Sequence, residues 1–315
     1  MTIEPDSSET PVAAANLRLL IVAGKGGVGR STVAAAIAAA GARAGRRTLV
    51  AELAGRADVA GLLGAEPGHG LDEVMLGRDL YHVSIDRQAT LRDYLDHEVP
   101  GPLPAGRLTR SRTFALLIDA TPGMGELLSI GKVWELAGKR RRRSGARPYD
   151  LVVLDGPASG QLMGLLRAPR TFGAIARMGP VARQTKGINR MLTDPAQTGV
   201  VLVAAPEQMA VTEAVALASD LRSDGVAVDQ VVINRTVASP FSREDEQTLA
   251  GAGGEDAALS SARWLDERAG VQRQQMSRLT EDLDDIPQTE LPFLFGGIDR
   301  QAIEDLATRL GGGEP

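Results

Sequence analysis

The residues with the clearest chemistry lie between Leu17 and Thr32, where the sequence reads LRLLIVAGKGGVGRST. The branched apolar run predicts a buried strand, the glycines predict a loop, and the alanine-rich stretch that follows predicts a helix. Backbone N–H groups of such a loop point at an anion, and the helix dipole favours negative charge at the same place. The order of these segments therefore favours a phosphate-binding loop over a glycine-rich turn without a ligand.

The loop fits the phosphate-binding pattern G-x-x-x-x-G-K-[ST] with one exception. Gly24 and Gly29 are the fixed glycines, Ser31 takes the position of the magnesium ligand, and Arg30 stands where the pattern has lysine. We expect nucleotide contacts along the whole segment, which comprises Gly24, Lys25, Gly26, Gly27, Val28, Gly29, Arg30, Ser31 and Thr32.

Arg30 predicts a division between binding and catalysis. Lysine is a compact point charge, whereas arginine is a wide planar fork that can still hold a phosphate through two hydrogen bonds. In-line attack depends on accurate placement, and a misplacement of about 1 Å can cost about 100-fold in rate. We therefore expect that nucleotide binding survives and that hydrolysis by this chain alone is slow. The alternative is that arginine replaced lysine at this position without a functional effect, as part of the arginine-rich composition of the chain.

The elements that position this loop alternate between strands and helices. Strands are expected at 17–23, 48–53, 81–85, 151–154, 199–205 and 228–234, and helices at about 30–44, 207–223 and 298–310. This alternation predicts an α/β three-layer sandwich with a mostly parallel central sheet. Together with the glycine loop after its first strand, it predicts the P-loop NTPase fold. Ligands of such sheets bind at the carboxyl ends of the strands. Both the glycine loop and Asp155, an acid at the end of an apolar run, fall there.

The chain is expected to form one domain with an insertion. Residues 1–15 are polar and predict a disordered leader, and residues 16–315 predict a single ATPase domain. A helical subdomain is expected at about 88–146 and 160–197, with helices interrupted at Pro169, Pro180 and Pro195.

The composition limits the classes of protein. The chain has no cysteine, which excludes disulfides, thiolate metal sites and iron–sulfur clusters. Its net charge of −5 argues against general nucleic-acid binding. No apolar run reaches the roughly 18 residues of a membrane span, and the acidic start is not a signal peptide, so a cytoplasmic location is expected. The basic run Lys139–Arg143 predicts a solvated loop, with a surface for an acidic partner or anionic lipid as the alternative.

Several segments resemble one family of nucleotide-binding proteins. The KGGVG spelling is similar to the deviant Walker A loop, in which a second lysine, here Lys25, opens the motif. Residues 155–169, DGPASGQLMGLLRAP, resemble the switch II segment of the ArsA and tail-anchored-protein-targeting (Get-type) ATPases, with Gln161 in place of histidine. Residues 121–129 resemble the P-G-x-x-E-x-x-S segment of that family. From about 17 to 310 the chain is identified as an atypical bacterial member of it.

The resemblance implies how a nucleotide is held. Asn234, in the segment VVINR, takes the place of the asparagine that reads adenine, and Pro292 and Phe293 belong to the last loop on the adenine side. The guanine-reading N-K-x-D motif is absent, which favours ATP. Mg²⁺ is expected on Ser31, with Asp155 acting through water.

The resemblance also implies two catalytic residues. The lysine at the position of Lys25 reaches across a dimer interface to the nucleotide of the partner in this superfamily. Glu52 stands where the family has the aspartate that activates water, and such a role needs a distance of about 3 Å to the water. A strand-end glutamate paired with a nearby arginine is the alternative for Glu52, and Asp58 is a second candidate acid.

The resemblance finally implies partners. We expect a homodimer or, because of Arg30, a heterodimer with a paralogous ATPase, in which nucleotide state opens and closes an interface or an apolar groove for a hydrophobic protein client. Methionines at 163, 178 and 191 suit such a groove, with ordinary core packing as the alternative. A nucleotide-gated pseudo-ATPase subunit is the alternative function, and a MinD- or ParA-type positioning ATPase is less favoured. No specific nucleic acid and at most peripheral membrane contact are expected.

Overall fold

The computed structural model describes residues 16–98, 121–139, 141, 145–176, 178–239, 241–251 and 257–311. The expected leader at 1–15 lies outside the described residues. The same holds for the expected helical stretch 99–120 and for most of the basic run.

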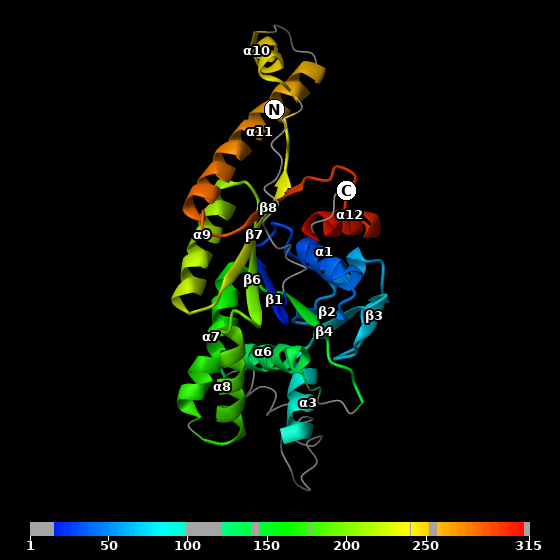
Figure 1. Cartoon of the computed structure of the whole chain (residues 1–315), viewed down its shortest axis with the longest axis vertical. Helices are drawn as coiled ribbons and strands as arrows, with labels where there is room; N and C mark the ends of the chain where they lie inside the picture. Colours follow the sequence, from blue (N-terminus) through cyan, green and yellow to red (C-terminus); the bar gives the residue numbers. More distant parts are fainter. Residues whose placement is uncertain are drawn as a thin grey trace.

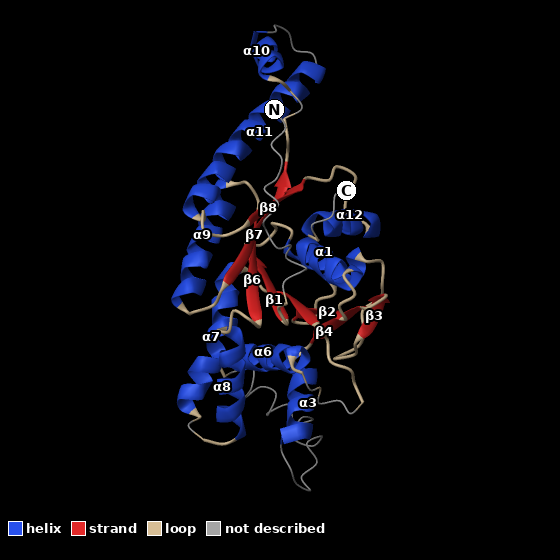
Figure 2. Cartoon of the chain, in the orientation of Figure 1, coloured by secondary structure: helices blue, strands red, loops and turns tan. Residues whose placement is uncertain are grey.

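A mostly parallel sheet of eight strands forms the centre of the molecule (Figure 2). All neighbouring strands are parallel except β3 and β4, which pair antiparallel at one edge. This arrangement confirms the predicted α/β fold. The strand order across the sheet is β3 (Val74–Gly77), β4 (Leu80–Ile85), β2 (Thr48–Leu53), β5 (Leu151–Asp155), β1 (Leu19–Gly24), β6 (Thr198–Ala204), β7 (Val228–Thr236) and β8 (Gln288–Pro292).

Helices cover both faces of the sheet, as the sequence predicted (Figure 1). Alternate residues of each strand point into two apolar cores, because successive side chains of a strand face opposite sides. One core contains side chains of α1 (Arg30–Arg43), α2 (Asp58–Leu62) and α12 (Arg300–Leu310). The other contains side chains of α6 (Met124–Ala137), α7 (Ser159–Ile175), α8 (Pro180–Leu192), α9 (Gln208–Ser223) and α11 (Ala257–Asp282).

Helix α1 gives the glycine loop a rigid support. Residues 33–41 of this helix are all buried, and six of them are alanine. Small side chains let the helix lie close to the sheet and to α12 at once, so its N-terminus is held firmly at the carboxyl end of β1.

The remaining helices lie at the two ends of the molecule. In Figure 1, α10 (Arg243–Gly251) and part of α11 project from one end, and α3 (Arg87–Glu98) lies at the opposite end with α6 and α8. Assigning α3, α6, α7 and α8 to a separate subdomain stays a proposal. No helix among the described residues is both long and apolar enough to cross a bilayer.

Some elements differ from the sequence prediction. Helix α7 continues through Pro169, so the expected interruption there is wrong, whereas Pro180 begins α8. A proline inside a helix removes one hydrogen bond, and Pro169 is buried with the apolar face of α7. Strands β3 and β8 and the short helix α2 were not predicted, because their sequences are short and carry no clear apolar alternation.

Candidate nucleotide-binding site

The loop between β1 and α1 requires glycine at three positions. Gly24, Gly27 and Gly29 have φ angles of 152°, 87° and 94°, which L-residues rarely adopt. A Cβ atom on Gly24 would lie 2.2 Å from the carbonyl oxygen of Val203, and one on Gly29 would lie 2.3 Å from Nδ2 of Asn234. At Gly24 and Gly29, the two fixed positions of the motif, both the positive φ angle and the close neighbouring atoms therefore exclude residues other than glycine.

The loop opens directly onto the N-terminus of α1. Gly29 is the N-cap, no described side chain caps the helix, and its first turn carries no acidic residue. The first N–H groups of a helix have no acceptor within the helix, and the helix dipole adds partial positive charge there. Gly26 and Gly27 are exposed beside it. This combination suits a phosphate group.

The two residues predicted to hold magnesium meet where β5 ends and α1 begins. Oγ of Ser31 donates a hydrogen bond of 2.7 Å to Oδ2 of Asp155. Nη2 of Arg56 lies 2.9 Å from Ser31 Oγ and 3.0 Å from the same Asp155 oxygen, and it also donates to Oδ2 of Asp58. The structure thus brings the predicted pair together and adds a cation that no sequence pattern indicated.

The oxygen atoms at this point fit a divalent cation. Carboxylate oxygens of Glu52, Asp58 and Asp155 lie within 4.8 Å of one another, and Mg²⁺ prefers such oxygen ligands. Oδ1 of Asp155 is buried, and no described residue donates a hydrogen bond to it. Burial raises the pKa of Asp155 above its ordinary value, although the Ser31 hydrogen bond and the charge of Arg56 act in the opposite direction. Ser31 and Asp155 would hold Mg²⁺ here, and the ion would neutralise phosphate charge.

Arg30 contacts protein in this structure. Its Nη1 atom donates a hydrogen bond to the carbonyl oxygen of Gly156, the residue after Asp155. Burial lowers the pKa of Arg30 below its ordinary value, and the charge of Asp155 partly offsets this effect. The guanidinium therefore joins the start of α1 to the start of switch II, and its contact with a phosphate stays a prediction.

Lys25 is held within its own chain. Its Nζ atom lies 2.8 Å from Oε1 of Glu213 on α9, and 32% of the lysine side chain is exposed. Oγ of Ser159, the first residue of α7, donates a 2.9 Å hydrogen bond to the other oxygen of Glu213. The hydrogen bond from Lys25 lowers the pKa of Glu213. The reach of Lys25 to a partner stays a prediction.

Glu52 is fully buried, and both of its carboxylate oxygens have partners. Oε1 accepts a hydrogen bond of 2.9 Å from the backbone N–H of Asp58, and Oε2 accepts one of 3.0 Å from that of Val59. Nε2 of His82 lies 2.8 Å from Oε2. Glu52 therefore anchors the start of α2, and in this conformation it is not free to orient a water molecule. Its partner is a histidine, not the arginine expected in the alternative interpretation.

The residues predicted on the adenine side lie at the carboxyl ends of β7 and β8. Asn234 pairs with Leu291 in the sheet register, directly before Pro292. The backbone N–H of Phe293 donates a 2.9 Å hydrogen bond to the carbonyl oxygen of Thr236. The Asn234 side chain is buried, and Nδ2 donates 2.8 Å to the carbonyl oxygen of Val28 in the loop. Asn234 thus supports the loop in this structure, and adenine recognition by these residues stays a prediction.

The sequence reasoning missed three residues of this site: Arg56, His82 and Glu213. None of them belongs to a motif, and each reaches the site through a contact between segments far apart in the chain. A strand at 81–85 was predicted, but its position beside β2 was not evident from the sequence. In the sheet His82 pairs with Val50, two residues before Glu52, which puts both side chains on the same face.

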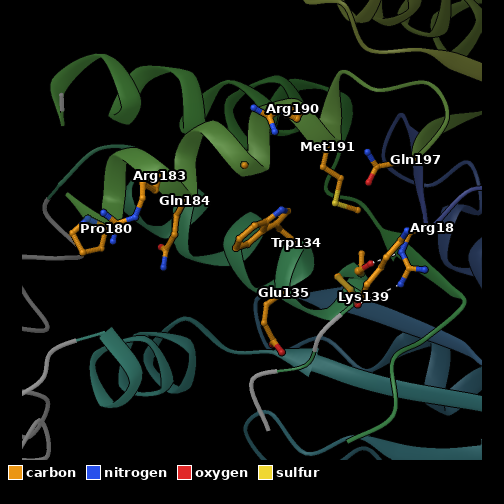
Figure 3. A pocket seen from close by; sticks show the side chains of 13 residues that line it. Arg18, Trp134, Glu135, Lys139, Pro180, Arg183, Gln184, Arg190, Met191 and Gln197 are labelled. Carbon is orange, nitrogen blue, oxygen red and sulfur yellow. Dashed lines mark hydrogen bonds between the residues drawn. The ribbon is translucent and has the colours of Figure 1, made fainter. Parts of the chain in front are cut away.

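A separate cavity of about 710 Å³ lies at the other end of the sheet (Figure 3). Arg18, directly before β1, and Trp134 on α6 line it together with Arg183 and Arg190 of α8. Arg18 is fixed there by hydrogen bonds to the carbonyl oxygens of Ala137, Gly138 and Tyr149.

The one described arginine of the basic run is not solvated. The side chain of Arg141 is 2% exposed and forms ion pairs with Glu73 and Glu135. Oη of Tyr149 donates a hydrogen bond to Glu73 beside it. The expectation of a solvated loop is therefore wrong for this residue, because the carboxylates of Glu135 and of the partly buried Glu73 hold it against the fold.

Fold and loop together define a P-loop nucleotide-binding protein. The family model of the anion-transporting ATPases, the ArsA ATPases, matches residues 17–179 and 172–310, and the chain belongs to this family. ATPase BagA of Mycobacterium tuberculosis is 27% identical over 326 residues, which cover 95% of this chain and 94% of BagA. ATPase GET3 of Kluyveromyces lactis is 24% identical over 341 residues, covering 95% and 90% of the two chains. ATPase GET3 of Eremothecium gossypii is 25% identical, covering 89% and 84%. The resemblance to the ArsA and Get-type ATPases is confirmed.

Proposed function

We propose that this ArsA-type ATPase binds ATP with Mg²⁺ in the loop Gly24–Thr32 and that two chains enclose the nucleotide. The observation that carries the proposal is the glycine backbone of the loop at the N-terminus of α1, with Ser31 2.7 Å from Asp155. Nucleotide state then opens and closes an interface between the chains. A cytoplasmic location stays a prediction from the sequence.

An apolar client is part of the same proposal. A cavity of about 200 Å³ lies among α3, α6, α7 and α8 and is lined largely by apolar side chains, among them Leu91, Leu127, Phe172, Val181 and Ile188. A larger groove for a hydrophobic segment could open from it. Two of the three methionines singled out in the sequence, Met163 and Met191, are buried in the core, and only Met178 is exposed. Methionine therefore gives the client proposal little support.

Calorimetry with the full chain tests the nucleotide proposal. We expect ATPγS with Mg²⁺ to bind with micromolar affinity and GTP analogues to bind more weakly. Sedimentation velocity then measures whether the nucleotide complex is a dimer. The absence of adenine-nucleotide binding at millimolar concentration would contradict the proposal, and a strict monomer with ATP and Mg²⁺ bound would contradict its dimer.

The second candidate function is a pseudo-ATPase subunit that binds nucleotide without turnover. Two contacts favour it: Arg30 bonds the carbonyl oxygen of Gly156, and Glu52 is occupied by α2 and His82. Single-turnover ATP hydrolysis by the native chain and by Arg30→Lys separates the two candidates. A faster Lys variant supports the view that Arg30 slows hydrolysis, and equal rates would show that view to be wrong. Tight binding without turnover, even with a paralogue added, favours the pseudo-ATPase.

A further inference from the structure

Arg56 lies within a group of oxygen atoms that otherwise suits a divalent ion. Its Nη2 atom contacts Ser31 Oγ at 2.9 Å, Asp155 Oδ2 at 3.0 Å and a carboxylate oxygen of Asp58. The side chain of Asp155 is fully buried, whereas that of Arg56 is 33% exposed. The guanidinium therefore reaches in from the surface and brings its positive charge to a buried carboxylate.

The guanidinium and a metal ion compete for the same oxygen atoms. An Mg²⁺ ion bound to Ser31 lies about 2.0–2.1 Å from its ligand atoms, and Nη2 is already within 3.0 Å of both Ser31 Oγ and Asp155 Oδ2. Two positive charges at such a short separation repel each other. The ion can bind the Ser31–Asp155 pair only when Arg56 has moved.

The position of Arg56 in the chain allows that movement. It follows Ala54 and Gly55, whose φ angles of 60° and 72° turn the chain sharply between β2 and α2. Nε and Nη2 both donate to Asp58, whose side chain is 57% exposed. Asp58 therefore offers Arg56 a partner on the outer side, so that the guanidinium can leave Asp155 and keep an ion pair.

We propose that Arg56 is the resident cation of this site, that it neutralises Asp155 in the metal-free protein, and that it sets the affinity of the site for a divalent ion. The inference concerns the same site as the proposed nucleotide function and rests on it. Its physical cause is competition between an intramolecular guanidinium and Mg²⁺ for Ser31 and Asp155.

Mn²⁺ titration of the nucleotide-free full-length chain, followed by electron paramagnetic resonance of the free ion, tests this inference. We expect Arg56→Gln to bind Mn²⁺ at least about tenfold more tightly than the native chain. Arg222→Gln is the matched control, because Arg222 pairs with exposed Asp285 outside the site, and it should leave the affinity unchanged. Equal Mn²⁺ affinities of Arg56→Gln and the native chain would overturn the proposal.

Two further variants keep the test decisive. Arg56→Lys keeps the charge but cannot donate to Asp58 and Asp155 with a planar fork, so an intermediate affinity is expected even if Arg56→Gln folds poorly. The double variant Arg56→Gln, Asp155→Asn should bind Mn²⁺ no more tightly than the native chain. If the double variant kept the higher Mn²⁺ affinity, the ion would bind elsewhere and the proposal would be overturned. Calorimetry on the same samples measures ADP binding and tests the proposed function separately from the role of Arg56. Failure to bind ADP contradicts the proposed function. A Mn²⁺ affinity that Arg56→Gln leaves unchanged contradicts the role of Arg56.

Discussion

Nζ of Lys25 and Oε1 of Glu213 lie 2.8 Å apart, so the lysine that opens the phosphate loop is anchored to α9 of its own chain. The same carboxylate accepts a hydrogen bond from Ser159 at the start of α7. The loop, switch II and α9 therefore meet at one acidic side chain. A partly exposed ion pair contributes no more than about 1 kcal/mol, so a phosphate group on a partner chain can compete with Glu213 for the lysine.

Removing the charge of Glu213 should favour dimerisation. Glu213→Gln frees Lys25 from its intrachain partner, and we expect a larger dimer fraction in sedimentation velocity with ATPγS and Mg²⁺. Lys25→Ala should lower that fraction. Glu207→Gln, an exposed acid next to the start of α9, is the control. A dimer fraction for Glu213→Gln at or below the native value would show that Glu213 does not restrain Lys25.

Two glycines of the loop should differ sharply in their tolerance of alanine. Gly24→Ala places a Cβ 2.2 Å from the backbone oxygen of Val203 at a φ of 152°, so the strands must shift. We expect a loss of about 2 kcal/mol or more in the free energy of unfolding, measured with urea. Gly26→Ala meets no described atom within 4 Å and should change the stability by less than about 0.5 kcal/mol. Similar losses for the two variants would contradict this account of the loop.

Substitutions of Glu52 should mainly lower the free energy of unfolding. Glu52→Ala leaves the N–H groups of Asp58 and Val59 without their acceptor, and a lost buried partner costs about 1–3 kcal/mol. Denaturant unfolding measures this loss. Glu52→Gln tests catalysis separately: because the carboxylate is occupied, we expect its single-turnover rate to stay within about tenfold of the native rate. A larger drop in a stable Glu52→Gln protein would restore the role of Glu52 as a base.

Arg141 should stabilise the fold in a pH-dependent way. Arg141→Gln leaves Glu73 without its buried partner, and breaking such a pair costs about 3 kcal/mol. Burial raises the pKa of Glu73, but the hydrogen bonds from Arg141 and Tyr149 and the charge of Arg141 together outweigh burial and lower the pKa below its ordinary value. An acid whose pKa is lower in the folded than in the unfolded chain stabilises the fold fully at pH values above its pKa in the unfolded chain. The free energy of unfolding of the native chain should therefore exceed that of Arg141→Gln by the full amount at pH 7. This difference should decline as the pH falls from about 4.5 through the lowered pKa of Glu73.

Urea unfolding at pH 7 and at several values below 4.5 measures this difference. Lys139→Gln is the matched control, because Lys139 begins the same basic run and is exposed, and its stability should equal that of the native chain. A loss for Arg141→Gln no larger than that of the control would support the solvated loop that the sequence suggested.

The fold and the backbone of the site could be predicted because their signals are local. The order strand, glycine loop and helix around Gly24 and Ser31 is written in adjacent residues, and the apolar run before Asp155 places that acid at the same edge of the sheet. Arg56, His82 and Glu213 could not be predicted, because their partners come from other strands and helices. The partners of Glu52 could not be predicted for the same reason, because they come from α2 and a neighbouring strand, and its role as a base stays a prediction.

The placement of the two tryptophans in this chain has an optical consequence. Trp134 lines the cavity beside Arg18 at the amino end of β1, one strand length, or about 20 Å, from the glycine loop at its carboxyl end. A ligand in the loop cannot quench Trp134 by touching it. Once Trp264 on α11 is replaced by phenylalanine, any nucleotide-induced change in emission would report a rearrangement transmitted along the sheet.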